Sequence, residues 1–290
     1  PPIDSSDMEP SNWQAIVKVI ADNYDNYDGF VVLHGTDTMS YTASALSFML
    51  QGLTKPVILT GSQLPISMLR TDGRENLLTS IEIAAAKDAE GNAMVPEVCV
   101  FFENRLLRGN RTTKINAEGF NAFRSYNFPW LAHAGIHIKY NHAIIRRPQK
   151  GNVFKPHYVM DSNVVVITLF PGIRREIISS IVNIPGLRAV VLRTYGSGNA
   201  PQKKWLIKLL KEAEAKGIIV VNVTQCSEGS IEMSRYRTGL QLLETGVVNG
   251  HDATVESTIT KLMFLVGHNL SNERIRQLMD CDLRGEITIR

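Results

Sequence analysis

The segment Gly29-Phe30-Val31-Val32-Leu33-His34-Gly35-Thr36-Asp37-Thr38-Met39 decides the fold of this chain. Residues 30–33 are four consecutive apolar residues and predict a buried strand, because a strand covered on both faces carries an unbroken apolar run. Residues 34–39 are mostly polar, and a helical apolar pattern follows them. The segment therefore predicts a strand, a short polar turn and a helix, the repeating unit of α/β folds.

The same alternation continues outward from this segment in both directions. The expected strands are residues 30–33, 56–60, 98–102, 164–169, 189–192 and 218–223, and the expected helices are residues 10–22, 42–49, 76–86, 175–182, 203–215, 254–266 and 272–279. We therefore expect an α/β protein with a larger N-terminal domain, built on a doubly wound and mostly parallel sheet, and a smaller C-terminal α/β domain. Prolines and glycines replace the periodic apolar residues near 140–160, so we expect domains at 1–143 and 163–290 with a linker at 144–162.

Composition excludes several classes of protein. The 290 residues are 44% apolar and 20% charged, which is too apolar for a disordered chain. The formal charge of +3 is spread without long runs of one sign, so neither nucleic acid nor a membrane is an expected partner. The cysteines Cys99, Cys226 and Cys281 are odd in number and far apart, which favours a reducing, cytoplasmic location over a disulfide framework.

The polar residues at the expected strand ends are candidates for a functional site, because ligands of open parallel sheets bind beyond the carboxyl ends of the strands. A threonine hydroxyl is a weak nucleophile until a base takes its proton, and a lysine held beside a carboxylate can be that base. Thr36, Lys114 and Asp37 supply these three groups. The alternative is that residues 34–39 only cap the helix that follows them.

These segments resemble a known family. Residues 29–39 with Thr42-Ala43 look like the second signature of the bacterial-type L-asparaginases, specifically the cytosolic type I branch of the asparaginase/glutaminase superfamily. Similar segments occur in the expected order along the chain: Asp4-Ser5-Ser6-Asp7-Met8, Lys55-Pro56-Val57, Thr60-Gly61-Ser62-Gln63, Arg111-Thr112-Thr113-Lys114, Leu192–Pro201 and Asn222-Val223-Thr224-Gln225-Cys226.

The resemblance implies hydrolysis of L-asparagine to L-aspartate and ammonia by a threonine hydroxyl, without a metal or an organic cofactor. By this resemblance Thr36 is a catalytic hydroxyl, Lys114 is its base, and Asp37 is a partner of Lys114 and a ligand of the substrate's amino group. Asp4, Ser5 and Ser6 are expected to bind the α-amino and α-carboxylate groups of the substrate, together with Thr36 and Asp37. The resemblance also implies a homo-oligomer, a dimer or a tetramer.

One signature of the family is not found in these 290 residues. The family's first strand ends in a Thr-Gly-Gly-Thr-Ile type motif that carries its usual nucleophile, and such a motif would lie upstream of Pro1. The expectation is therefore that an N-terminal segment bearing the nucleophile is missing from this sequence. Residues 1–290 alone are then expected to be inactive or nearly so.

Some type I members carry a separate effector site for asparagine. Carried over by resemblance, that site involves Thr113, Arg193, Thr224, Gln225 and Cys226, with Arg193 pairing with an α-carboxylate. The alternative for Cys226 is an ordinary buried thiol.

Two other functions stay open at this stage: a lysophospholipid ester hydrolase and a non-catalytic asparagine sensor. The charges of Asp4 and Asp37 argue against an apolar acyl chain in the pocket.

Several other residues have plainer interpretations. His34 is expected to be a structural hydrogen-bonding residue, and the trio His133, His137 and His142 lacks the neighbouring ligands of a zinc motif. Two further groups are expected to be structural: Arg105, Arg108 and Arg111 as a solvated charged face, and Leu242, Leu243, Ile259, Leu262 and Met263 as helix core.

Overall fold

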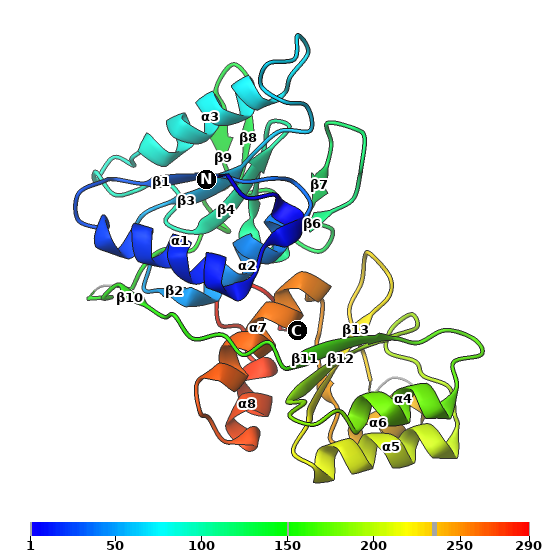
Figure 1. Ribbon diagram of the computed structural model, residues 1–290. Helices are drawn as coiled ribbons and strands as arrows, with labels where there is room; N and C mark the ends of the chain where they lie inside the picture. The colour runs from blue at the N-terminus through cyan, green and yellow to red at the C-terminus, as the bar shows by residue number, and fades with distance from the viewer. Residues whose placement is uncertain (1, 150, 234–236, 290) are drawn as a thin grey trace. The chain divides into compact units, whose positions relative to one another are not determined.

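The computed structural model describes residues 2–149, 151–233 and 237–289 (Figure 1). The chain divides into two compact units, Pro1–Tyr158 and Val159–Arg290. The division lies within residues 144–162, where the sequence loses its periodic apolar pattern. Each unit is an α/β domain, so the predicted fold class is confirmed.

The first unit is built on a sheet with the strand order β1-β3-β4-β5-β8-β9. β1 (Phe30–Leu33), β3 (Val57–Thr60) and β4 (Val98–Phe102) are parallel, and they coincide with the three strands expected from apolar runs. β5 (Arg105–Arg108), β8 (Ala132–Ala134) and β9 (Ile138–Tyr140) continue the sheet in antiparallel pairs. The sheet is therefore mixed, because β5, β8 and β9 pair in antiparallel fashion. No strand was predicted in this part of the chain.

In the described part of this unit, the α-helices are α1 (Pro10–Asp22), α2 (Met39–Met49) and α3 (Gly73–Ala85). α1 begins with Pro10 in its first turn and with a capping box between Glu9 and Asn12, which satisfies backbone donors at the helix start. α3 packs on β1 and β3, while α2 packs on β4 and is buried along nearly its whole length. The remaining short elements are η1 (Ser5–Asp7), β2 (Leu50–Gln51), η2 (Gly109–Arg111), β6 (Thr113–Lys114), β7 (Phe123–Arg124) and β10 (Lys155–Pro156).

Arg108 and Arg111, two of the three arginines of β5 and η2, do not lie on the solvated face that the sequence predicted, whereas the side chain of Arg105 is 35% exposed. Arg108 and Arg111 are 4% and 3% exposed. Arg108 donates to both carboxylate oxygens of Glu97, at 2.6 and 3.1 Å, and both guanidinium groups lie over the ring of Phe128. The prediction was wrong because Glu97 and Phe128 come from other parts of the chain and compensate the burial of two charges.

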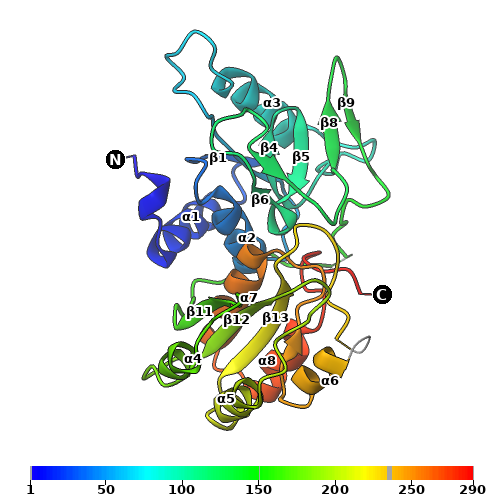
Figure 2. The same ribbon diagram turned by 90° about the vertical axis from the view of Figure 1, so that its right-hand side faces the viewer.

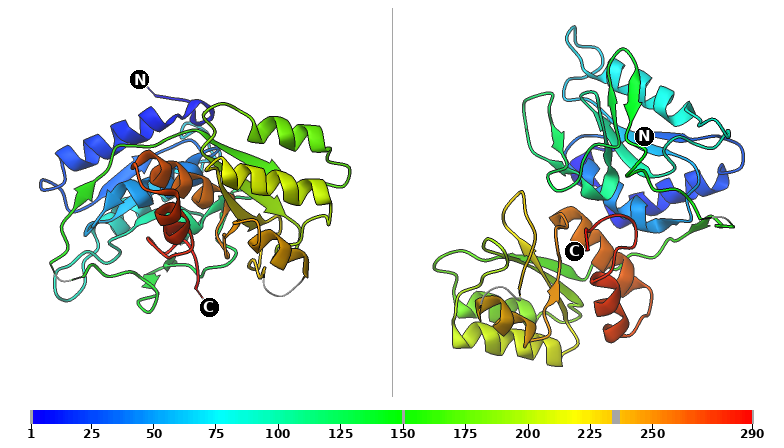
Figure 3. Two further views of the ribbon diagram at one scale, coloured as in Figure 1. Left: turned by 90° about the horizontal axis from the view of Figure 1, so that it is seen from below. Right: turned by 180° about the vertical axis from the view of Figure 1, so that it is seen from behind.

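The second unit contains a parallel sheet with the order β11-β12-β13-β14. Its strands are β11 (Val164–Thr168), β12 (Ala189–Thr194), β13 (Ile219–Thr224) and β14 (Val248–Asn249). Its helices are α4 (Arg175–Val182), α5 (Lys204–Ala215), α6 (Arg237–Leu243), α7 (Val255–Gly267) and α8 (Asn272–Met279). Figure 2 shows α4 and α5 on one face of the sheet. Figure 3 shows the orange and red helices α7 and α8 beside each other.

Two apolar cores result, one for each face of this sheet. One core joins the strands to α4 and α5, and the other joins them to α7 and α8. Leu242 and Leu262 are fully buried, as expected for helix core. Leu243 is 41% exposed, so its assignment to the core was wrong. Adjacent helical residues point in directions about 100° apart, and Leu243 points away from the face on which Leu242 is buried.

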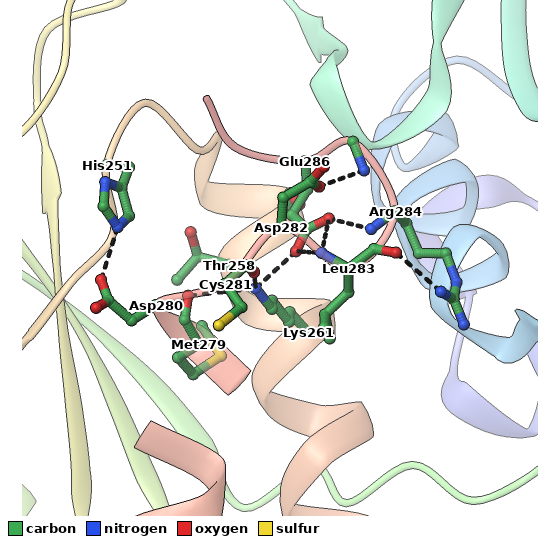
Figure 4. Close-up of polar contacts among 12 residues, drawn as sticks. His251, Thr258, Lys261, Met279, Asp280, Cys281, Asp282, Leu283, Arg284 and Glu286 are labelled. Carbon is green, nitrogen blue, oxygen red and sulfur yellow. Dashed lines mark hydrogen bonds and ion pairs between the residues drawn. The ribbon is translucent and has the colours of Figure 1, made fainter. Parts of the chain in front are cut away.

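A buried ion pair ties the segment at residues 279–286 to α7 (Figure 4). Lys261 Nζ contacts Glu286 Oε1 at 2.6 Å and also donates to the backbone oxygens of Met279 and Cys281. Glu286 in turn accepts backbone N–H groups of Leu283 and Arg284. Both charged side chains are at most 2% exposed, so this segment is held by polar contacts that are shielded from water.

Candidate active site

The polar residues after β1 form a short loop that leads into α2. Thr38 occupies the N-cap position of α2, yet its hydroxyl donates to the backbone oxygen of Ser5 at 2.6 Å and makes no capping bond. Gly35 passes so close to Ser5 that an added Cβ would lie 2.6 Å from Ser5 Oγ. Glycine is therefore needed at position 35 for a close approach, and the loop does more than cap a helix.

Lys114 reaches this loop from β6, 77 residues along the chain from Asp37. Its Nζ donates to Thr36 Oγ1 at 2.8 Å and to Asp37 Oδ1 at 2.6 Å. The Lys114 side chain is 20% exposed and that of Asp37 is 63% exposed. The structure thus brings together the three predicted catalytic residues, and it leaves the carboxylate accessible to a ligand.

Gln63 is a fourth member of this cluster, and no role was predicted for it from the sequence. Thr36 Oγ1 donates to Gln63 Oε1 at 3.0 Å. Gln63 follows the end of β3, the strand that pairs with β1 in parallel. Its position at a neighbouring strand end is the signal that could have identified it.

The segment around η1 places only one of its three predicted substrate ligands against the loop. Ser5 is buried and contacts the loop as described above. Asp4 and Ser6 are exposed, and Asp4 Oδ1 accepts from both the backbone N–H and the hydroxyl of Ser6. The backbone hydrogen bond from Ser6, followed by that of the Ser6 hydroxyl, holds the pKa of Asp4 below its ordinary value. Asp4 is therefore an ionised carboxylate at neutral pH.

His34 behaves as the structural residue that the sequence predicted. Its Nδ1 lies 2.6 Å from the backbone oxygen of Gly35, and its Nε2 lies 2.9 Å from Thr42 Oγ1. A carbonyl oxygen can only accept, so Nδ1 carries the proton. Burial lowers the pKa of His34, which keeps the ring neutral at neutral pH.

Four of the five predicted effector residues lie together in the second unit, at or just after the ends of β12 and β13. Gln225 Nε2 donates to the backbone oxygens of Leu169 and Arg193, and Thr224 Oγ1 donates to that of Gly196. Arg193 Nε is a buried donor without a hydrogen-bond partner among the described residues. The fifth residue, Thr113, belongs to the first unit.

Cys226 is exposed, so the alternative interpretation of it as a buried thiol was wrong. It is the second residue after the end of β13. All three cysteines are free thiols, and only Cys99 is buried.

The three histidines with helix-like spacing lie instead on and around the β8–β9 hairpin. His133 belongs to β8, and its ring stacks on Trp130. In the part of the chain that the structure describes, no group of three His, Cys, Asp or Glu side chains has the geometry of a metal site. Among the same residues, no helix has both the length and the apolar character needed to cross a membrane.

Comparison with known proteins places both units in one family. A family model described as asparaginase, N-terminal, matches residues 1–146, and a model described as the glutaminase/asparaginase C-terminal domain matches residues 163–279. L-asparaginase 1 of Escherichia coli (strain K12) is 49% identical over 288 residues, which are 99% of this chain and 83% of that protein.

Two further relatives extend this comparison. The crystal structure of L-asparaginase I from Vibrio cholerae superposes with a TM-score of 0.91 at 46% identity, covering 100% of this chain and 85% of that one. The 60 kDa lysophospholipase of Mus musculus is 43% identical over 100% of this chain, which spans 50% of that protein.

Proposed function

The chain belongs to the asparaginase family, and we propose that it hydrolyses the side-chain amide of L-asparagine at the centre formed by Thr36, Lys114 and Asp37. Its L-asparaginase activity, and hence its class as an amide hydrolase, follows from similarity that runs along the whole chain at high identity. The roles of individual residues are our proposal, and one observation carries it. Lys114 Nζ lies within hydrogen-bond distance of both the Thr36 hydroxyl and the Asp37 carboxylate.

The chemistry of this centre begins with a proton transfer. Lys114 in its neutral form removes the proton of Thr36, and Asp37 stabilises the ammonium that results. The Thr36 oxygen then attacks the carboxamide carbon or takes the proton of an attacking group. When the C–N bond breaks, the ammonium of Lys114 returns a proton to the leaving nitrogen, which departs as ammonia. Water completes the hydrolysis to L-aspartate.

The substrate is a zwitterion, and the site offers groups of suitable charge to bind it. The exposed carboxylate of Asp37 accepts from the α-ammonium, and Asp4 adds a second negative charge near η1. The hydroxyl group of Ser5 donates to the α-carboxylate, and that of Ser6 does so once it turns away from Asp4, to which it donates in the structure. Fixed carboxylates and donors around a small zwitterion orient its amide as well as bind it.

Regulation by a second asparagine is part of the proposal. Arg193 Nε is a buried donor whose partner an α-carboxylate would supply, and Thr224, Gln225 and Cys226 lie next to it along the end of β13. We assign Thr113 to the same effector site from the family resemblance. Such a site makes the dependence of the rate on asparagine sigmoidal, and Arg193→Ala is expected to make it hyperbolic.

The type I branch is further expected to act as a cytoplasmic homo-oligomer, either a dimer or a tetramer. The free thiols of Cys226 and Cys281 are exposed, which suits a reducing compartment. Ile66, Met68 and Leu69 form an exposed apolar stretch between β3 and α3, which suits burial in an assembly. Light scattering coupled to size-exclusion chromatography measures the assembly directly.

Ester hydrolysis is a second candidate function, because a relative that carries the name lysophospholipase is 43% identical to the chain. The same hydroxyl and base can attack an ester carbonyl. The charged groups of the site argue against it, because desolvating Asp37 beside an acyl chain is costly.

One experiment distinguishes these functions. Full-length protein is incubated with L-asparagine and, separately, with a lysophospholipid in micelles, and ammonia and fatty acid are measured. We expect ammonia release that Asp37→Asn weakens by raising the KM for L-asparagine about tenfold or more, because an ion pair with the α-ammonium is lost. Fatty-acid release without ammonia release would overturn the proposal.

A further inference from the structure

The position of the Thr36 hydroxyl depends on a residue outside the Thr36–Lys114–Asp37 centre. Thr36 Oγ1 lies 3.0 Å from Gln63 Oε1 and 2.8 Å from Lys114 Nζ. A threonine has three staggered χ1 rotamers, and two partners on different elements select one of them. The contact with Gln63 therefore helps to set the orientation of the Thr36 hydroxyl, which is a reacting group in the proposed mechanism.

The orientation of the Gln63 amide is fixed by its other end. Gln63 Nε2 lies 3.0 Å from the backbone oxygen of Gly119 and 3.4 Å from that of Asn116. Backbone oxygens can only accept, so the amide nitrogen must face them and the amide oxygen must face Thr36. The hydrogen bond between Thr36 and Gln63 consequently has one direction, from the Thr36 hydroxyl to the amide oxygen.

The backbone of Gln63 is fixed as well. Its N–H donates to both carboxylate oxygens of Asp72, at 3.0 and 3.1 Å. Asp72 also accepts from the backbone N–H of Leu64 and from the side chain of Asn76, which is buried. Gln63 is thus held at its main chain by the start of α3 and at its side chain by the loop between β6 and β7.

This arrangement determines where the proton of Thr36 points. Because Thr36 donates to Gln63, its oxygen accepts from Lys114, which also donates to Asp37. The proton becomes available to Lys114 by rotation about the Cβ–Oγ bond, and the oxygen itself need not move. Gln63 keeps that oxygen at 2.8 Å from the base while the proton is still on it.

We propose that Gln63 is a positioning residue of the reaction: its amide oxygen holds the Thr36 hydroxyl against Lys114, and its amide nitrogen anchors the β6–β7 loop. This inference rests on the proposed function. The two ends of one side chain then have separable effects, one on the rate of catalysis and one on the stability of the loop.

Three variants separate these effects. Gln63→Met keeps the length of the side chain but removes both the acceptor and the donor. Gln63→Glu keeps an acceptor toward Thr36 and removes the donor toward Gly119. Asn121→Ala is the matched loop control, because it removes the 2.9 Å contact with Asn116 and leaves both ends of Gln63 intact.

The expected results differ between the variants. Gln63→Met lowers kcat for L-asparagine at least about tenfold, since misplacement of a reacting group by about 1 Å can cost 10²-fold, while KM changes by less than about threefold. Gln63→Glu and Asn121→Ala keep kcat within about threefold of the wild type. All three variants lower the Tm, because each loosens the β6–β7 loop.

A further variant gives a readout that a merely structural role would not produce. Serine lacks the β-branch that restricts χ1 of threonine, so its hydroxyl depends more on Gln63. The fold-loss of kcat caused by Gln63→Met is therefore expected to be larger in the Thr36→Ser background than in the wild type.

Clear outcomes would overturn this inference. It fails if Gln63→Met keeps the wild-type kcat or exceeds it, if Gln63→Glu is as slow as Gln63→Met, or if Asn121→Ala is as slow as either. Thr36→Val separates this failure from failure of the proposed function. If Thr36→Val still releases ammonia at the wild-type rate, the proposed catalytic role of Thr36 is wrong; if it is inactive while Gln63→Met is unimpaired, only the role of Gln63 is wrong.

Discussion

Lys114 and Lys261 each pair with a carboxylate oxygen at 2.6 Å, yet their surroundings are opposite. The pair of Lys261 with Glu286 is at most 2% exposed, and Lys261 Nζ has two backbone oxygens as further acceptors. The pair of Lys114 with Asp37 is partly open to solvent, and Lys114 Nζ has the Thr36 hydroxyl as its other partner.

The difference shows how one kind of ion pair, a lysine with a carboxylate, can contribute either to stability or to catalysis. The three N–H groups of Lys261 all meet oxygens that can only accept, so this lysine has no proton to gain from its neighbours. The Thr36 hydroxyl next to Lys114 can give up a proton, and the exposed Asp37 can bind a ligand. A lysine–carboxylate pair therefore becomes a candidate catalytic group through its third partner and its exposure, not through its distance.

The largest effect on the rate is expected at the solvent-accessible pair of Lys114 with Asp37. Lys114→Met removes the proposed base, and we expect ammonia release from L-asparagine to fall about 10²–10⁴-fold, the usual contribution of a general base. Circular dichroism should show a Tm close to that of the wild type. Lys139→Met, at an exposed lysine of β9, is the control and should leave the rate unchanged. A Lys114→Met enzyme with a nearly normal rate would contradict the assignment.

The next largest effect is a loss of stability at the buried pair of Lys261 with Glu286. Lys261→Met leaves the Glu286 carboxylate buried without its counter-ion, which typically lowers the free energy of unfolding by about 3–5 kcal/mol. Urea unfolding followed by fluorescence measures this change. The rate per folded molecule should stay normal, and a stability equal to that of the wild type would show that the ion pair is not important to the fold.

A smaller effect is expected when both charges of the buried pair are removed. In Lys261→Met with Glu286→Leu, no uncompensated charge remains in the apolar surroundings, so the double variant should be more stable than Lys261→Met alone. The comparison uses the same urea titration. If the double variant is less stable than Lys261→Met alone, the backbone contacts of Glu286 matter more than its charge.

The smallest expected effect is on the pH dependence of the Tm, and it comes from His34. Burial lowers the pKa of His34 below its ordinary value of 6.5, so the unfolded chain binds a proton at this residue more readily than the folded protein does. The contribution of His34 to stability is therefore complete above its ordinary pKa and decreases as the pH falls below it. Between about pH 7.5 and about pH 5.5, the Tm of the wild type should fall more than that of His34→Asn. Equal decreases would show that another group dominates this range.

Much of the fold could be predicted from the sequence, because its parallel strands are continuous apolar runs. The strands at Phe30–Leu33 and Val98–Phe102 and the helix at Arg175–Val182 match their predicted bounds. The antiparallel part of the first sheet was not predicted. β8 and β9 have three residues each and are partly exposed, so they carry no apolar run, and their pairing depends on contacts across the hairpin.

The candidate site was predictable only in part, for a similar reason. Thr36, Asp37 and Lys114 were all predicted from the sequence, whereas the distances from Lys114 to the other two residues required the fold of β6. The role of Gln63 depends on the two backbone oxygens that orient its amide, which no sequence motif encodes. The burial of Arg108 likewise depends on Glu97, which directly precedes β4, the strand that pairs with β5.

The most direct measurement is the rate of ammonia release from L-asparagine by Thr36→Val, compared with the wild type at equal concentrations of folded full-length protein. This variant keeps Lys114 and Asp37 and removes only the hydroxyl that distinguishes their pair from that of Lys261 with Glu286. We predict a rate at least about 10²-fold lower, with an unchanged Tm. A rate within about threefold of the wild type would contradict the account, because catalysis would then not depend on the hydroxyl beside Lys114.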